Sequence, residues 1–162
     1  MEEFSVELIE QGWAVNLYSV RFSGEEYTEF EKFMLKFPEG SEYEEDMNII
    51  LAWLNRIMRN GALERYFRPE GRYGSGVKAI PIETNKLRLY CLRLSDDTLI
   101  LGNGDLKDAD TWQNSPTLKP YVEILNDAER FIRSRFKQKS IHYDEDNILV
   151  GDLTFKRKHD EN

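Results

Sequence analysis

The sequence has very little of what a disulfide-stapled, metal-binding or membrane protein needs. Cys91 is the one cysteine among 162 residues, so no intrachain disulfide and no CxxC metal pair can form. The two histidines, His142 and His159, form no HxxxH pair, and neither a Walker loop nor a nucleophile elbow is present. No apolar run approaches the roughly 18 residues that a membrane span needs. We therefore expect no metal, no cofactor and no membrane partner.

The composition indicates one domain in a reducing compartment. The N-terminus, Met1-Glu2-Glu3, is acidic, whereas a signal peptide begins with positive charge. A single cysteine fits the cytoplasm, which is where we expect the protein. Apolar residues make up 40% of the chain, enough for the core of one domain, so we treat 1–162 as a single unit.

Charge is distributed unevenly along the chain. The net charge is -8, which argues against a nucleic-acid-binding surface over the whole protein. Residues 1–55 carry 3 basic and 13 acidic side chains, whereas residues 56–93 carry 9 basic and 3 acidic ones. Residues 94–162 carry 10 basic and 14 acidic side chains. A basic middle between two acidic flanks directs attention to 56–93 as the place where an anionic partner would bind.

The N-terminal third alternates at first and then changes to helical spacing. Apolar residues alternate loosely over 4–22, which is typical of two strands joined by a turn. Capping boxes at Ser23–Glu26 and Ser41–Glu44 each precede an apolar stripe with helical spacing. Helices are therefore expected over 23–37 and 41–60.

Three short strand patterns follow in quick succession, over Val77–Ile82, Leu87–Leu94 and Thr98–Gly102. Their connectors are too short for a parallel crossover, so the spacing predicts an antiparallel three-stranded meander over 77–102. The Gly102-Asn-Gly104 segment that ends it is typical of a turn with positive φ.

The last third predicts one helix and one strand. Ser115 is placed to cap a helix over 115–136, with Pro116 at its first position. A short strand is expected over 148–155. Strands and helices segregate along the chain instead of alternating, which favours an α+β fold with helices packed on an antiparallel sheet.

The segment 87–94 carries the most specific chemical pattern. Alternation places Arg88 and Tyr90 on one strand face, and Leu87, Leu89 and Cys91 on the other. An arginine stabilises phosphate charge with a fixed fork of donors, and a tyrosine can stack on a base or hold a proton. The pair would suit an RNA phosphodiester. The alternative is a partly solvated strand face with a cross-strand ion pair.

Further basic residues surround this strand. Residues 65–73 interleave aromatic side chains with Arg65, Arg68 and Arg72, a pattern found where proteins contact nucleic acid. Lys78 and Lys86 extend the positive charge along the meander. These five residues are the candidate substrate-binding set. Alternatively, the aromatic residues belong to the core, and the arginines form a solubilising rim or pair with the acidic N-terminal third.

The order of elements and two segments, Lys86–Arg93 and Leu99–Lys107, resemble the RelE/HigB-like toxins of bacterial toxin–antitoxin systems. The resemblance covers roughly 45–136. It implies helices packed on an antiparallel sheet, cleavage of mRNA on the ribosome without a metal, and a cognate antitoxin protein that blocks the site. Cleavage in such enzymes proceeds by attack of a ribose 2′-OH on its own phosphate.

Carried over by position, the resemblance implies three catalytic residues. Arg88 matches the strand arginine that faces the scissile phosphate, and Lys107 is the basic residue that follows the last strand. Tyr90 supplies the aromatic side chain, with Trp112 as the alternative. These toxins are usually shorter and strongly basic, whereas this chain is acidic, and its first 55 residues and the tail after 137 have no counterpart. The acidic total favours a second hypothesis, a non-catalytic protein-binding or regulatory domain of the same fold.

Overall fold

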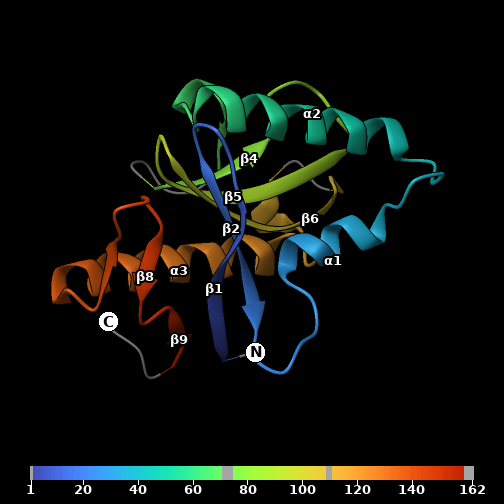
Figure 1. Ribbon diagram of the computed structural model, residues 1–162. Helices are drawn as coiled ribbons and strands as arrows, with labels where there is room; N and C mark the ends of the chain where they lie inside the picture. The colour runs from blue at the N-terminus through green and yellow to red at the C-terminus, as the bar shows by residue number, and fades with distance from the viewer. Residues whose placement is uncertain (1, 71–74, 109–110, 159–162) are drawn as a thin grey trace.

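The computed structural model describes residues 2–70, 75–108 and 111–158, and within them the chain is an α+β protein (Figure 1). Three α-helices pack on a seven-stranded, mostly antiparallel sheet, and a separate two-stranded ribbon lies near the C-terminus. The helices are α1 Glu29–Lys36, α2 Glu44–Asn60 and α3 Lys119–Gln138. The strands are β1 Glu3–Gln11, β2 Asn16–Phe22, β3 Arg68–Pro69, β4 Val77–Ile80, β5 Leu87–Ser95, β6 Thr98–Leu106, β7 Ile141–Tyr143, β8 Leu149–Gly151 and β9 Thr154–Lys156.

The large sheet has the order β3-β4-β5-β6-β2-β1-β9. Strands β4, β5 and β6 are consecutive antiparallel neighbours, so the predicted meander is present, with its last strand extended to Leu106. Strands β1 and β2 form the expected N-terminal hairpin. The sequence pattern did not indicate that β2 pairs in parallel with β6, which inserts this hairpin into the sheet beside the meander.

Helices cover the sheet on both faces. In Figure 1, α2 lies on one side of the sheet and α3 on the other. Side chains of α3, such as Val122 and Leu125, share one apolar core with Tyr90 and Leu92 of β5. Side chains of α1 and α2 share a second core with Leu87, Leu89 and Cys91. Strand β5 therefore separates two hydrophobic cores.

This double cover rules out the alternative in which Arg88 and Tyr90 lie on a partly solvated strand face. Only 6% of Arg88 and 2% of Tyr90 is exposed. The cause is the apolar stripe of α3, which packs on the face that carries both residues. Burying a large apolar side chain contributes about 1.5–3 kcal/mol, enough to draw the helix over the strand.

The first two helices begin later in the chain than predicted. Helix α1 begins after Thr28, whose hydroxyl accepts a hydrogen bond from the Glu31 amide while the Glu31 carboxylate accepts one from the Thr28 amide. The capping box is therefore five residues beyond Ser23. Helix α2 begins at Glu44 after Tyr43, with no side-chain cap, and it ends before Gly61, whose φ is 109°.

The C-terminal elements also differ from expectation. Helix α3 begins at Lys119, four residues beyond the predicted start. The Ser115 hydroxyl still accepts a hydrogen bond from the Leu118 amide, as expected of a capping serine, but the residues between them form a turn that precedes the helix. The expected strand 148–155 is divided between two sheets. Strand β8 pairs with β7 in the ribbon, and β9 pairs with β1 at the edge of the large sheet. No helix in the described ranges is long and apolar enough to cross a membrane.

Gly102 and Gly104 lie inside β6 and not in a turn, and neither has a positive φ. The register between β5 and β6 shifts between Leu89 and Cys91, so this part of β6 carries an extra residue opposite Tyr90. Glycine is needed at 104 because an added Cβ would collide with the backbone carbonyl oxygen of Arg88. The predicted turn is therefore wrong, and close approach of two strands is the reason for the glycine.

We expect Gly104→Ala to lower the free energy of unfolding by about 3 kcal/mol, because the backbone of β5 at Arg88 would have to move. Gly102→Ala is the matched control. The Cβ added at Gly102 would meet the flexible Leu125 Cδ1 at 3.0 Å and the backbone oxygen of Tyr90 at 3.2 Å, so the loss of unfolding free energy should be smaller. Urea unfolding of both variants measures the difference, and equal costs would contradict the close-approach explanation.

Candidate functional site

Arg88 of β5 forms part of a charged cluster on the α3 side of the sheet, near the β3 edge. Arg68 on β3, Ala79 on β4 and Tyr90 on β5 are register neighbours across three strands. Arg88 is two residues from Tyr90, so both side chains lie on the same face. Glu70, which follows β3, reaches Arg88, and its amide continues the β3–β4 ladder by donating to the Val77 oxygen at 3.2 Å.

Arg88 is the most buried cation of this cluster. Its Nη1 lies 3.5 Å from Glu70 Oε1, which makes a loose ion pair, and its side chain is 7% exposed. Its buried Nε has no hydrogen-bond partner among the described residues. Burial and the neighbouring charge of Arg68 lower the pKa of Arg88, whereas Glu70 acts in the opposite direction. A buried guanidinium with an unused donor can bind an anion.

Glu70 is the carboxylate of the cluster, and the sequence reasoning missed it. Burial raises the pKa of Glu70 above 4.5, and the positive charges of Arg88, Arg68 and Lys107 limit the rise. The backbone oxygen of Glu70 accepts a 2.6 Å hydrogen bond from the Trp112 indole, which anchors this end of β3. A carboxylate with a raised pKa beside cations is the kind of group that enzymes use as a general base.

The other cluster members differ in their freedom. Arg68 is half-buried, and its Nε donates to the Ile82 oxygen at 3.1 Å. Lys107 is exposed, and its amide donates to the Lys86 oxygen at 3.0 Å, just beyond the end of β6. Tyr90 is buried, and burial together with the charge of Glu70 raises the pKa of its hydroxyl. Among the described residues the cluster therefore has three cations around Glu70.

A second set of charges adjoins it. Asp105, the register partner of Arg88 on β6, accepts a 2.9 Å ion pair from Lys36 of α1. Lys36 also donates to the Gly104 oxygen at 2.5 Å and to the Tyr121 hydroxyl at 3.1 Å. Asp105 is thus paired with Lys36, and the ion-pair partner of Arg88 is Glu70.

The structure divides the predicted site residues into two groups. Arg68, Arg88, Tyr90 and Lys107 come together around Glu70. The remaining three described residues lie apart from the cluster, and Arg72 lies outside the described residues. Lys78 lies on β4 between Val77 and Ala79, which face α3, so it is on the opposite face of the strand. Its side chain is half-buried, and its backbone oxygen lies 3.7 Å from Cys91 Sγ. Lys86 is exposed near Asp46, and Arg65 stacks on Tyr66.

The sequence contained a signal for Glu70 that the reasoning did not use. Glu70 is one of three acidic residues in the basic segment 56–93, and it follows a proline in a stretch read as loop. An isolated carboxylate within a run of cations is placed to pair with one of them. Within the described ranges, no group of three or more histidine, cysteine, aspartate or glutamate side chains is arranged to hold a metal ion.

Comparisons with known proteins do not extend this picture: no family model, no curated protein and no solved structure matches the chain.

The raised pKa of Glu70 predicts a sign for the pH dependence of stability. The folded protein holds this proton more tightly than the unfolded chain does, so ionisation of Glu70 weakens the fold as pH rises from about 4.5 through the folded-state pKa. We therefore expect wild type to lose stability relative to Glu70→Gln between acidic and neutral pH. Urea unfolding of both proteins across this range measures the difference.

Arg88→Met provides a second arm of the same measurement. Among the neighbouring charges, that of Arg88 lowers the pKa of Glu70 most, so removal of Arg88 should raise that pKa further. The pH-dependent gap between Arg88→Met and the double variant Arg88→Met/Glu70→Gln should then be wider than the gap in the wild-type background. A gap that is constant with pH, or of opposite sign, would exclude a desolvated Glu70.

Proposed function

We propose that this protein cleaves RNA without a metal ion, using the cluster around Glu70. The observation that carries the proposal is the largely buried Glu70 carboxylate, 3.5 Å from the Arg88 guanidinium, on whose pKa the charges of Arg68 and Lys107 also act. Metal-independent cleavage of RNA needs a base for the 2′-hydroxyl and cations for the phosphate charge that develops in the transition state. The cluster contains both kinds of group.

The proposed reaction is an internal transesterification at phosphorus. The 2′-oxygen attacks the adjacent phosphorus, and the Glu70 carboxylate takes the hydroxyl proton. The bond from phosphorus to the 5′-oxygen breaks, and the Lys107 ammonium gives a proton to that oxygen. The products are a 2′,3′-cyclic phosphate and a 5′-hydroxyl end. Arg88, through its unused Nε, and Arg68 stabilise the extra negative charge on the phosphate. Tyr90, two residues further along the same strand face, positions Arg88.

The narrower form of the proposal is a cytoplasmic toxin of the RelE/HigB kind, with mRNA on the ribosome as substrate and an antitoxin protein as partner. The antiparallel β4–β5–β6 meander between helices supports it, as does Arg88 on the central strand of that meander. The acidic N-terminal third would then be a surface for a basic partner segment, since 1–55 carries 13 acidic and 3 basic side chains.

The alternative is a non-catalytic protein-binding or regulatory domain. The burial of Arg88 and Tyr90 favours it, because a phosphate must reach a side chain that is 7% exposed. In this case the Glu70–Arg88 pair would be structural. The alternative predicts no transcript cleavage, and a protein partner that binds wild type and Glu70→Gln equally well.

We expect the purified protein to cut single-stranded RNA in the presence of EDTA, and Glu70→Gln to slow cleavage by about 100-fold or more, the usual contribution of a general base. Arg88→Met should slow it comparably. The measurement is cleavage rate on a labelled transcript, with end-group analysis for the cyclic phosphate.

Lys78→Ala is the control for loss of positive charge, because Lys78 alternates with the β4 residues that face α3 and so lies outside the cluster. It should cleave at the wild-type rate. Cleavage that stops on metal chelation, or that proceeds unchanged in Glu70→Gln, would contradict the assignment of the base.

The toxin form of the proposal has its own test in cells. Expression of wild type should arrest bacterial growth, and Glu70→Gln should relieve the arrest while accumulating as folded protein. Growth curves with and without induction measure this. Arrest of equal strength in both strains, with intact transcripts, would support the non-catalytic alternative instead.

A further inference from the structure

The outer face of α2 and its surroundings form a basic, aromatic surface on an otherwise acidic protein. No acidic residue occurs between Met47 and Leu63, although the chain as a whole has a net charge of -8. Apart from Ala52, the exposed residues of α2 from Met47 onwards are arginines and asparagines. We define the α2 strip by six residues with aromatic or guanidinium side chains, namely Trp13, Trp53, Arg56, Arg59, Arg65 and Tyr66.

One part of the α2 strip is a continuous series of contacts between guanidinium groups and aromatic rings. The Arg56 guanidinium lies over the Trp53 ring at 4.5 Å, and Trp53 meets Tyr66 edge to face at 5.9 Å. Arg65 lies over Tyr66 at 5.2 Å. A guanidinium that stacks on a ring keeps the donors at its edge available, so both arginines are held ready for phosphate oxygens.

The acidic side chains at the border of the strip are already engaged. Glu83 accepts a 3.0 Å hydrogen bond from the Trp53 indole, and Glu64 faces Arg93 at 3.5 Å. Neither pairs with Arg56 or Arg65 in any ion pair of the described residues. The three arginines of the strip outnumber the two bordering carboxylates, so the strip keeps a net positive charge.

Trp13 completes the strip from the β1–β2 hairpin. Its side chain is 92% exposed, which is unusual for the largest apolar residue type. The hairpin tip is fixed, since the Ala14 amide donates to the Met58 oxygen at 2.7 Å and the Gly12 amide to the Val15 oxygen at 2.8 Å. The indole is thus presented on a rigid support instead of a loose loop.

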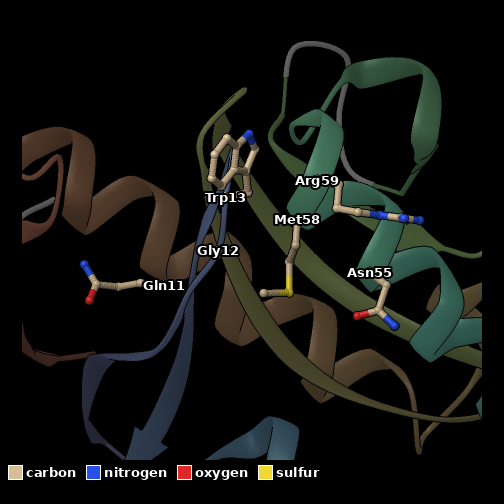
Figure 2. Close-up of a pocket in the computed structure, with 6 residues that line it drawn as sticks. All are labelled: Gln11, Gly12, Trp13, Asn55, Met58 and Arg59. Carbon is tan, nitrogen blue, oxygen red and sulfur yellow. The ribbon is translucent and has the colours of Figure 1, made fainter.

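A pocket of about 450 Å³ lies beside this indole, between the hairpin tip and α2 (Figure 2). Asn55, Met58 and Arg59 of the helix line it together with the tip residues. The pocket combines an open aromatic face, a thioether, a side-chain amide and a guanidinium. A base can stack on the first two, and the last two can bond to its edge and to its phosphate.

We infer that the α2 strip binds single-stranded RNA, with a base stacked on Trp13 and phosphates on Arg59, Arg56 and Arg65. This inference deepens the proposed function, on which it rests, by assigning the surface that holds the substrate. The strip also lies within reach of the cluster: the chain from Arg65 to Glu70 spans at most about 18 Å. A strand of RNA on the strip can therefore turn round the β3 edge towards Glu70.

Aromatic faces distinguish this ligand from an acidic protein segment. An acidic peptide would use the arginines and leave the Trp13 ring unstacked, whereas every base has a face that stacks on an indole. The side-chain amides of Asn55 and Asn60 add donors and acceptors that match base edges.

The test uses a 2′-O-methyl oligonucleotide, which cannot be cleaved, so that binding is measured apart from catalysis. Trp13→Ala should weaken binding about 10-fold by loss of one stacked base. Arg56→Ala/Arg59→Ala should lower the slope of log affinity against log salt by about 1.4, the value for two phosphate contacts on a single strand. Arg133→Ala/Lys137→Ala, with the same charge change on the exposed face of α3, should bind as wild type does.

Tryptophan emission separates stacking from charge attraction. The oligonucleotide should quench wild-type emission and quench Trp13→Ala much less, whereas polyglutamate should neither quench nor compete. Wild-type affinity in Trp13→Ala, or equal competition by polyglutamate, overturns the inference. Glu70→Gln should bind the oligonucleotide as wild type does, because Glu70 lies outside the α2 strip. Loss of cleavage together with retained binding therefore concerns the catalytic cluster, whereas loss of binding in Trp13→Ala concerns the strip.

Discussion

The burial of β5 on both faces is the constraint on which the rest of the structure depends. A strand that lies between two helical layers has no solvated side, so each charge on it must be met by a partner inside the protein. Arg93 lies where the cover ends, and it donates to the Ala62 oxygen at 2.6 Å. Arg88 lies deeper, and Glu70 is its one ion-pair partner among the described residues. The shifted pKa values of Glu70 and Arg88 follow from their burial at this position.

The uneven charge of the sequence has a local physical explanation in α2. Its first turn carries Glu44, Glu45 and Asp46, and its last turn carries Arg59. This order matches the helix macrodipole, which favours negative charge at the N-terminus and positive charge at the C-terminus. The transition from acidic to basic sequence near residue 55 therefore falls within one helix, and it divides the outer surface into an acidic and a basic part.

Local patterns predicted the elements better than their partners. Alternation and short connectors were sufficient for the meander, and helical spacing was sufficient for all three helices. The apolar stripe of α3 was visible, but its target was not, because Arg88 and Tyr90 made the face that it covers look amphipathic. Similarly, Arg68, Tyr90 and Lys107 were expected near Arg88, whereas Glu70 was missed because it lies in an irregular segment with no periodicity. Contacts between distant segments decide such cases, and spacing along the chain carries no information about them.

The parallel pairing of β2 with β6 has a consequence for how the chain reaches its native state. Tyr18 pairs with Ile100, so the hairpin nearest the N-terminus completes its hydrogen bonding only when a strand some eighty residues later is in place. Strand β9 then closes the edge left by β1. Closing so long a loop early costs entropy, which slows folding. During synthesis the first hairpin leaves the ribosome with an open edge, and it must wait for the meander before that edge is protected.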